Sequence, residues 1–138
     1  MALTLAPNST RQSNARQRYV SDAVKTHTPE RLVTMLFDKL VSELDRAEIA
    51  MRGGDLYAAN DALVRSQAIV LELRASLRLD VWDGAKGLAS LYDFFVREII
   101  QANVSRDPAR IATTRILVEP IRDAFHQAAA EVLAGQAG

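Results

Sequence analysis

The chain has two histidines, His27 and His126, and no cysteine, so a transition-metal site or a neutral-pH base would need one of these imidazoles. A di-metal centre in a helical bundle requires two Glu-x-x-His motifs and two further glutamates. The nearest match runs from Asp123 to His126, in a single copy and with Asp in place of Glu. The residues therefore predict two ordinary surface histidines and no metal site.

Side chains suited to nucleophilic chemistry also lack a recognisable arrangement. Ser66, Ser76 and Ser90 belong to no Gly-x-Ser-x-Gly motif, and the chain has no glycine-rich phosphate-binding loop. Asp38 and Asp93 do not form a spaced carboxylate pair. Ser66 falls on an apolar stripe, where its hydroxyl should donate to a carbonyl of its own helix. We expect no enzyme and no cofactor, and partner binding becomes the leading function.

Composition narrows the class of partner. Lys plus Arg equals Asp plus Glu at 17 each, so the formal net charge of zero disfavours a nucleic-acid surface. Arg11, Arg16 and Arg18 lie in a stretch without an acid, which is most often a solvated tail. No apolar run approaches the ~20 residues of a membrane span. The start of the chain lacks the basic region of a signal peptide, so we expect a cytoplasmic protein.

For the N-terminal part, the sequence predicts a tail followed by a short helix. Residues 1–14 are small, polar and aperiodic, which predicts a flexible tail. Residues 15–25 predict a short amphipathic helix that carries Tyr19 and Val24 on one side.

Four longer helices should follow. The first begins at Pro29 and ends before Gly53-Gly54, because proline suits the first helical turn and glycine the residue after the last. Asp55 is expected to cap the second and Asp83 the third, and Asp107-Pro108 should start the fourth.

Periodicity and short turns together predict an all-α fold. It is an antiparallel up-down-up-down four-helix bundle with a short N-terminal fifth helix. Residues 15–134 form the single domain, and residues 135–138 form a frayed C-terminus. Pro120 interrupts the fourth helix, which predicts a kink or two abutting helices.

Apolar residues at three- and four-residue spacing divide into expected core and expected surface. The predicted core includes Leu63, Val70, Leu73, Phe95, Val118 and Phe125, together with the stripe Leu91, Phe95, Ile99 and Ala102. Tyr92, Phe94, Val96 and Ile100 are candidates for a surface groove. Trp82 has two interpretations: it covers the end of the bundle, or it anchors a partner.

Three segments, in order, resemble the signature of the FliS family of flagellar secretion chaperones. They are Tyr19, Val24 and Thr28-Pro29-Glu30-Arg31-Leu32 with Met35-Leu36-Phe37-Asp38; Leu88, Leu91-Tyr92-Asp93-Phe94 and Ile100-Gln101-Ala102-Asn103; and Ile121-Arg122-Asp123-Ala124-Phe125. Phe37, Phe94 and Phe125 stand where the family often has Tyr, Tyr and Trp, and Val81-Trp82-Asp83 replaces its Gly-Gly-Glu.

The resemblance implies a cytoplasmic export chaperone for flagellin. Its client would be the disordered C-terminal region of flagellin, kept from premature filament polymerisation and competent for flagellar type III secretion. The resemblance adds Tyr19, Val24, Leu32 and Leu36 to the partner-binding residues. It also implies that the segment with Tyr19 and Val24 covers part of the groove when no client is bound.

Further partners follow less directly from the sequence. Export-apparatus components or a co-chaperone, and a homodimer without client, are expected in addition to flagellin. The alternative function is a non-enzymatic helical adaptor or regulator that binds another protein or itself. Helix-turn-helix DNA binding fits poorly, because the helices are long and their charges mix both signs.

Overall fold

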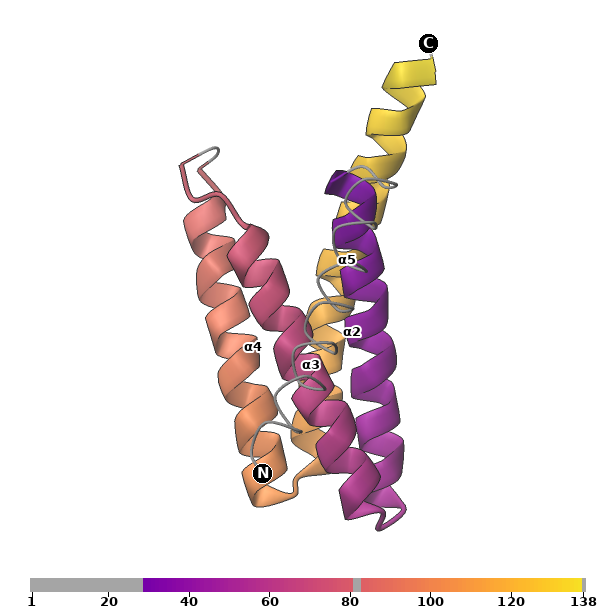
Figure 1. Cartoon of the computed structure of the whole chain (residues 1–138), viewed down its shortest axis with the longest axis vertical. Helices are drawn as coiled ribbons and strands as arrows, with labels where there is room; N and C mark the ends of the chain where they lie inside the picture. The colour runs from indigo at the N-terminus through magenta and orange to yellow at the C-terminus, as the bar shows by residue number, and fades with distance from the viewer. Residues whose placement is uncertain (1–28, 81–82, 138) are drawn as a thin grey trace, which may run out of the picture. The chain divides into compact units, whose positions relative to one another are not determined.

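The computed structural model describes residues 29–80 and 83–137. Within these ranges the backbone forms four α-helices and no strand, which confirms the all-α prediction (Figure 1). The helices are α2 (Pro29–Arg52), α3 (Leu56–Ser76), α4 (Ala85–Ser105) and α5 (Pro108–Ala137). The predicted tail and short helix before residue 29 lie outside the described residues, as do Val81 and Trp82.

Most helix ends follow from local side-chain chemistry. Asp55 caps α3 as predicted, since its Oδ1 accepts a hydrogen bond from the Ala58 N–H at 3.1 Å. Gly54 follows α2 with a φ of +83°, a left-handed conformation that costs glycine little. The prediction for α4 was wrong: its N-cap is Gly84, and Asp83 lies one residue too early to serve as the cap.

Pro120 does not divide α5. The helix is continuous from Pro108 to Ala137, so the alternative of two abutting helices was wrong, while the kink stays a prediction. Pro120 and Ile116 are both exposed, and solvent can therefore bond to the Ile116 carbonyl that loses its helical partner.

Helices α3 and α4 lie side by side in opposite directions (Figure 1). Asn103 near the end of α4 donates from Nδ2 to Asn60 Oδ1 near the start of α3, at 2.8 Å. At the other end, Arg74 of α3 pairs with Asp93 of α4 at 3.3 Å. In these two contacts, an early residue of α3 meets a late residue of α4, and a late residue of α3 meets an early residue of α4. The two helices therefore run antiparallel.

Helices α2 and α5 are linked in the same antiparallel sense. The His126 Nε2 lies 2.7 Å from Asp38 Oδ1, and Arg115 Nη2 lies 2.9 Å from Glu48 Oε1. The later residue of α2 thus contacts the earlier residue of α5, as in an antiparallel pair. The order agrees with the predicted up-down-up-down bundle, whose full topology with a fifth helix stays a prediction.

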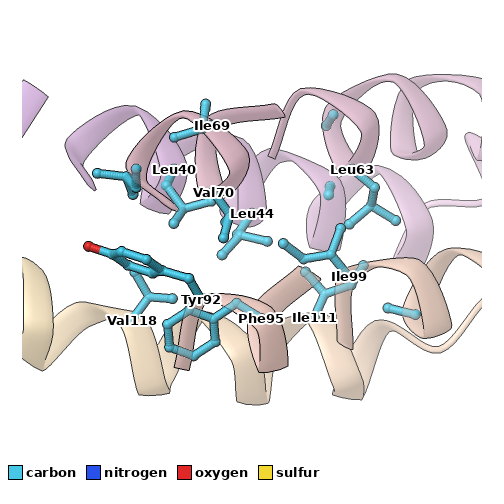
Figure 2. Close-up of a cluster of buried hydrophobic side chains, with 14 of the residues drawn as sticks. Leu40, Leu44, Leu63, Ile69, Val70, Tyr92, Phe95, Ile99, Ile111 and Val118 are labelled. Atoms are coloured by element: carbon cyan, nitrogen blue, oxygen red, sulfur yellow. The ribbon is translucent and has the colours of Figure 1, made fainter. Parts of the chain in front are cut away.

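A cluster of buried apolar side chains from all four helices forms the core. Figure 2 shows its centre, with Leu40, Leu44, Leu63, Ile69, Val70, Tyr92, Phe95, Ile99, Ile111 and Val118 labelled. The core predictions for Leu63, Val70, Leu73, Phe95, Ile99, Ala102 and Val118 are confirmed. Ser66 is also buried, and its hydroxyl donates to the Ala62 carbonyl at 2.8 Å, as expected.

Two neighbours on α4 exchange their predicted places. Leu91, expected in the core, is 43% exposed, whereas Tyr92, expected at the surface, is only 2% exposed. The inward stripe of α4 contains Leu88, Tyr92, Phe95, Ile99 and Ala102, at steps of three and four. Adjacent residues differ by about 100° around a helix, so Leu91 falls outside this stripe.

An aromatic cluster joins three helices at one end of the core. The Phe37 ring of α2 stacks on Phe125 of α5 at a centroid distance of 5.1 Å and packs against Tyr92 of α4 at 6.3 Å. Phe37 is fully buried, while Phe125 is only half-buried and packs against the core from its edge.

The Phe37→Ala substitution should lower the free energy of unfolding by about 3–5 kcal/mol, because it empties a buried site at the centre of this cluster. Urea titration followed by far-ultraviolet circular dichroism measures the change. The control Ile49→Ala, at an exposed position of α2, should stay within about 0.5 kcal/mol. A loss below about 1 kcal/mol for Phe37→Ala would contradict the central role of this ring.

An ion-pair network between α2 and α5 lowers the pKa of one carboxylate. Arg115 donates to Glu48 at 2.9 Å and to Glu119 at 3.0 Å, and Arg52 donates to the other Glu48 oxygen at 2.9 Å. The hydrogen bond from Arg115 is the main reason that the pKa of Glu48 lies below its ordinary value of 4.5.

A lowered folded-state pKa means that Glu48 stabilises the protein above pH 4.5 and loses this effect as the pH falls through the folded-state pKa. Glu48→Gln should therefore lower the free energy of unfolding by about 1 kcal/mol at neutral pH. The difference from the unmodified protein should shrink in acid. Denaturant titrations at several pH values test this, with the exposed Glu72→Gln as control; a difference that does not depend on pH would contradict it.

Candidate functional site

The predicted groove residues of α4 do not share one surface. Tyr92 points into the core, and Phe94 lines a cavity against α5. Ile100 lies one turn before Asn103, which bonds to α3, and Val96 lies one turn before Ile100, so these two face the α3 side. These four residues, although close in sequence, thus lie in three places: the core, the α5 side and the α3 side of α4.

An apolar cavity opens at the end of the core where α3 stops and α4 begins. We call it the end cleft; its volume is about 180 Å³. Its walls come from all four helices and the turn after α3, and consist of Val33, Leu73, Ser76, Leu77, Arg78, Leu88, Tyr92 and Phe125. The end cleft can accept a large apolar side chain from a partner.

The chemistry of the end cleft is that of a hydrophobic receptor. Of the described residues that line it, Arg78 alone is charged. Burial raises the pKa of the Tyr92 phenol, so this group stays neutral near pH 7 and can donate a hydrogen bond. Figure 2 shows the Tyr92 hydroxyl at the edge of the labelled core side chains. The cleft offers apolar contact and hydrogen bonding, and its Ser76 hydroxyl donates to the Leu73 carbonyl at 2.9 Å.

A second cavity, of about 290 Å³, lies between α4 and α5. Phe94 and Leu117 provide its apolar contacts, whereas Arg110 and Glu98 pair across it at 3.4 Å. Its remaining lining residues are Asp107, Ala109, Thr113 and Thr114. The polar lining makes it a poorer receptor for apolar side chains than the end cleft.

The other predicted site residues have separate positions. Leu36 is half-buried and packs against the core. Leu32 is half-buried in the first turn of α2. Tyr19 and Val24 lie outside the described residues.

Sequence reasoning missed the end cleft, although it identified several of its residues as core positions. Leu73 and Leu77 continue one apolar stripe, but α3 ends at Ser76, so Leu77 lies past the last turn. When the apolar spacing of a helix continues past its last residue, it indicates an apolar side chain at an open end of the core. The meeting of Val33, Leu88 and Phe125 at the same place has no counterpart in the sequence pattern.

Two further kinds of site are absent from the described residues. No group of three or more histidine or acidic side chains in this part of the chain could hold a metal ion. No helix within residues 29–80 and 83–137 is long and apolar enough to cross a membrane.

Comparisons with known proteins agree on one family. Residues 12–132 match the family described as flagellar protein FliS. The chain is 35% identical to the flagellar secretion chaperone FliS of Salmonella typhimurium strain LT2, over 78% of this chain and 82% of the relative. It is 29% identical to that of Bacillus subtilis strain 168, over 80% and 82%. The crystal structure of a flagellar chaperone from bacteria has a similar fold, with a TM-score of 0.70 over 87% of this chain and 98% of that one, at 21% identity.

Proposed function

Since the chain belongs to the FliS family of flagellar secretion chaperones, we propose that its client is the disordered C-terminal region of flagellin. In this function the protein acts in the cytoplasm as a non-enzymatic chaperone. It covers the apolar surfaces through which flagellin polymerises, and keeps the client competent for flagellar type III secretion. Export-apparatus components or a co-chaperone are further proposed partners.

The end cleft is the observation that carries this proposal. A disordered client loses conformational entropy when it binds, so the complex needs several well-buried apolar anchors. Burial of one large apolar side chain contributes roughly 1.5–3 kcal/mol. The end cleft offers such a site between Val33, Leu77 and Phe125, at a place where the described side chains leave room.

The client is proposed to extend from the end cleft over further apolar positions. They are the predicted residues Leu36, Phe94, Val96 and Ile100, which are half-buried or exposed. In the proposed function the four helices form the up-down-up-down bundle. The predicted fifth helix acts as a lid through Tyr19 and Val24. Tyr92 takes part as a wall of the cleft.

Leu77→Asp should weaken binding of a flagellin C-terminal fragment about tenfold or more, because it places a carboxylate in an apolar cavity. Isothermal titration calorimetry measures the affinity, and circular dichroism checks that the helices remain. Leu79→Asp is the matched control: Leu79 is exposed, lies two residues further on and does not line the cleft. Equal affinity of the two variants would rule out the cleft as a client site, and no micromolar binding by the unmodified chain would refute the chaperone proposal.

Deletion of residues 1–25 tests the lid. A lid competes with the client, so its removal should leave the affinity for the flagellin fragment unchanged or raise it by the inverse of the open fraction. The same titration measures this change, and the four described helices should remain folded because none begins before Pro29. Weaker binding after the deletion would contradict a simple lid and indicate that Tyr19 contacts the bound client.

A further inference from the structure

The cavity between α4 and α5, here called the α4–α5 cavity, has an apolar end and a polar end. The two helices leave their connecting turn in opposite directions (Figure 1). Phe94 lies one turn before Glu98 on α4, and Leu117 lies two turns after Arg110 on α5. Phe94 and Leu117 therefore share one end of the cavity, and the Glu98–Arg110 ion pair lies nearer the turn. A side chain with an apolar stem and a polar tip matches this division.

Three other polar residues of the cavity wall are already bonded to the backbone of α5. The hydroxyls of Thr113 and Thr114 donate to carbonyls four residues before them, at 3.0 and 2.8 Å. Asp107 Oδ1 accepts from an N–H in the first turn of α5 at 3.1 Å, and the positive end of the helix dipole offsets the charge of this carboxylate. Recognition of a polar group in the cavity therefore falls mainly to Glu98 and Arg110.

The Glu98–Arg110 pair has hydrogen-bonding capacity left for a ligand. Its Nε–Oε2 distance is 3.4 Å, whereas strong charge-assisted hydrogen bonds are about 2.7–2.9 Å long. Arg115 closes on Glu48 at 2.9 Å, so the cavity pair is long in comparison with another ion pair of this protein. A guanidinium has several N–H donors and a carboxylate several acceptor positions. The Glu98 and Arg110 side chains are 27% and 39% exposed, so a ligand can reach both.

The two opposite charges select a neutral group that both donates and accepts hydrogen bonds. A cation near Glu98 would be repelled by Arg110, and an anion near Arg110 would be repelled by Glu98. A hydroxyl carries its donor and its acceptor on one atom, whereas a carboxamide carries them on two atoms bonded to the same carbon. Its NH₂ group can donate to Glu98 while its oxygen accepts from Arg110. A carboxamide therefore matches a carboxylate and a guanidinium that lie side by side.

We propose that the α4–α5 cavity binds the side-chain carboxamide of a glutamine or asparagine of the flagellin client. This inference rests on the proposed function and adds a polar anchor to the apolar one in the end cleft. The stem of the bound side chain packs against Phe94 and Leu117, and its amide bonds to Glu98 and Arg110. The volume of about 290 Å³ leaves room for such a side chain.

A polar anchor gives the complex a selectivity that apolar contacts lack. An apolar pocket discriminates weakly between side chains that differ by one methylene group, whereas a site built for hydrogen bonds strongly rejects a ligand that cannot form them. The α4–α5 cavity therefore fixes which segment of a disordered client lies against α4 and α5. It shares no lining residue with the end cleft, so the two anchors can be tested separately.

Substitution of each member of the pair distinguishes a neutral bound group from a charged one. In the full-length chain, Glu98→Met and Arg110→Met should each weaken binding of a flagellin C-terminal fragment about tenfold, because each removes a hydrogen bond to a charged group. Isothermal titration calorimetry measures the affinity. The control Arg122→Met should leave it unchanged, since Arg122 forms an ion pair on the same helix but lines neither cavity. A cationic group would bind more tightly after Arg110→Met, and an anionic group after Glu98→Met. Either result, or two unchanged affinities, would overturn the proposal.

A double-mutant cycle separates direct contact from a purely structural role of the pair. Each glutamine of the fragment is changed in turn to methionine and each asparagine to leucine, which keeps the approximate shape and removes the amide. One of these changes should weaken binding to the unmodified chain about tenfold, yet have almost no further effect on Arg110→Met, because the contact is already lost there. If every change has the same effect on both proteins, the pair does not contact a client carboxamide and the proposal is overturned.

Failure of this proposal can be told apart from failure of the proposed function. Fragment binding that Leu77→Asp weakens and the two Met variants do not would overturn the carboxamide site alone. No micromolar binding by the unmodified chain would refute the chaperone function and this inference with it. Circular dichroism should show that the variants keep their helices, since both side chains are partly exposed. Glu98→Gln and Arg110→Gln replace any Met variant that unfolds, with the same expected loss of affinity.

Discussion

The contact of Phe37 with two other aromatic rings is the interaction on which this molecule depends most. It joins α2 to Phe125 of α5 and to Tyr92 of α4, which are far apart in sequence. Phe125 and Tyr92 also form walls of the end cleft. The packing that stabilises the core therefore also shapes the proposed client site, and a substitution that loosens Phe37 should disturb both.

Polar contacts complement this packing by fixing how the helices are ordered. Asn60–Asn103 and Arg74–Asp93 hold α3 against α4, and the Glu48–Arg115 pair holds α2 against α5. An exposed pair such as Arg74–Asp93 contributes little to stability, usually under 1 kcal/mol. The main effect of these contacts is to fix the register between neighbouring helices, because apolar stripes alone tolerate small shifts along the helix axis.

The proposed client site recognises single side chains. The end cleft is concave and suits single apolar side chains of an extended or newly ordered client.

The sequence by itself determined the helices and most of their ends. Asp55, Gly53-Gly54 and the Asp107-Pro108 step act through bonds within a few residues, so they can be read without knowledge of the fold. The inner stripes of α3 were equally clear, because seven buried positions define one side. The family was also recognisable, since its motifs occur in order along one chain.

Tertiary structure decided what depends on small rotations and on distant segments. Whether Leu91 or Tyr92 faces the core depends on a rotation of about 100°, which a broad apolar segment does not specify. Pro120 stays within one helix because its side of α5 is exposed. The end cleft exists only where Val33, Leu77 and Phe125 meet, and no local pattern encodes that meeting, because it arises from packing between helices that are remote in sequence.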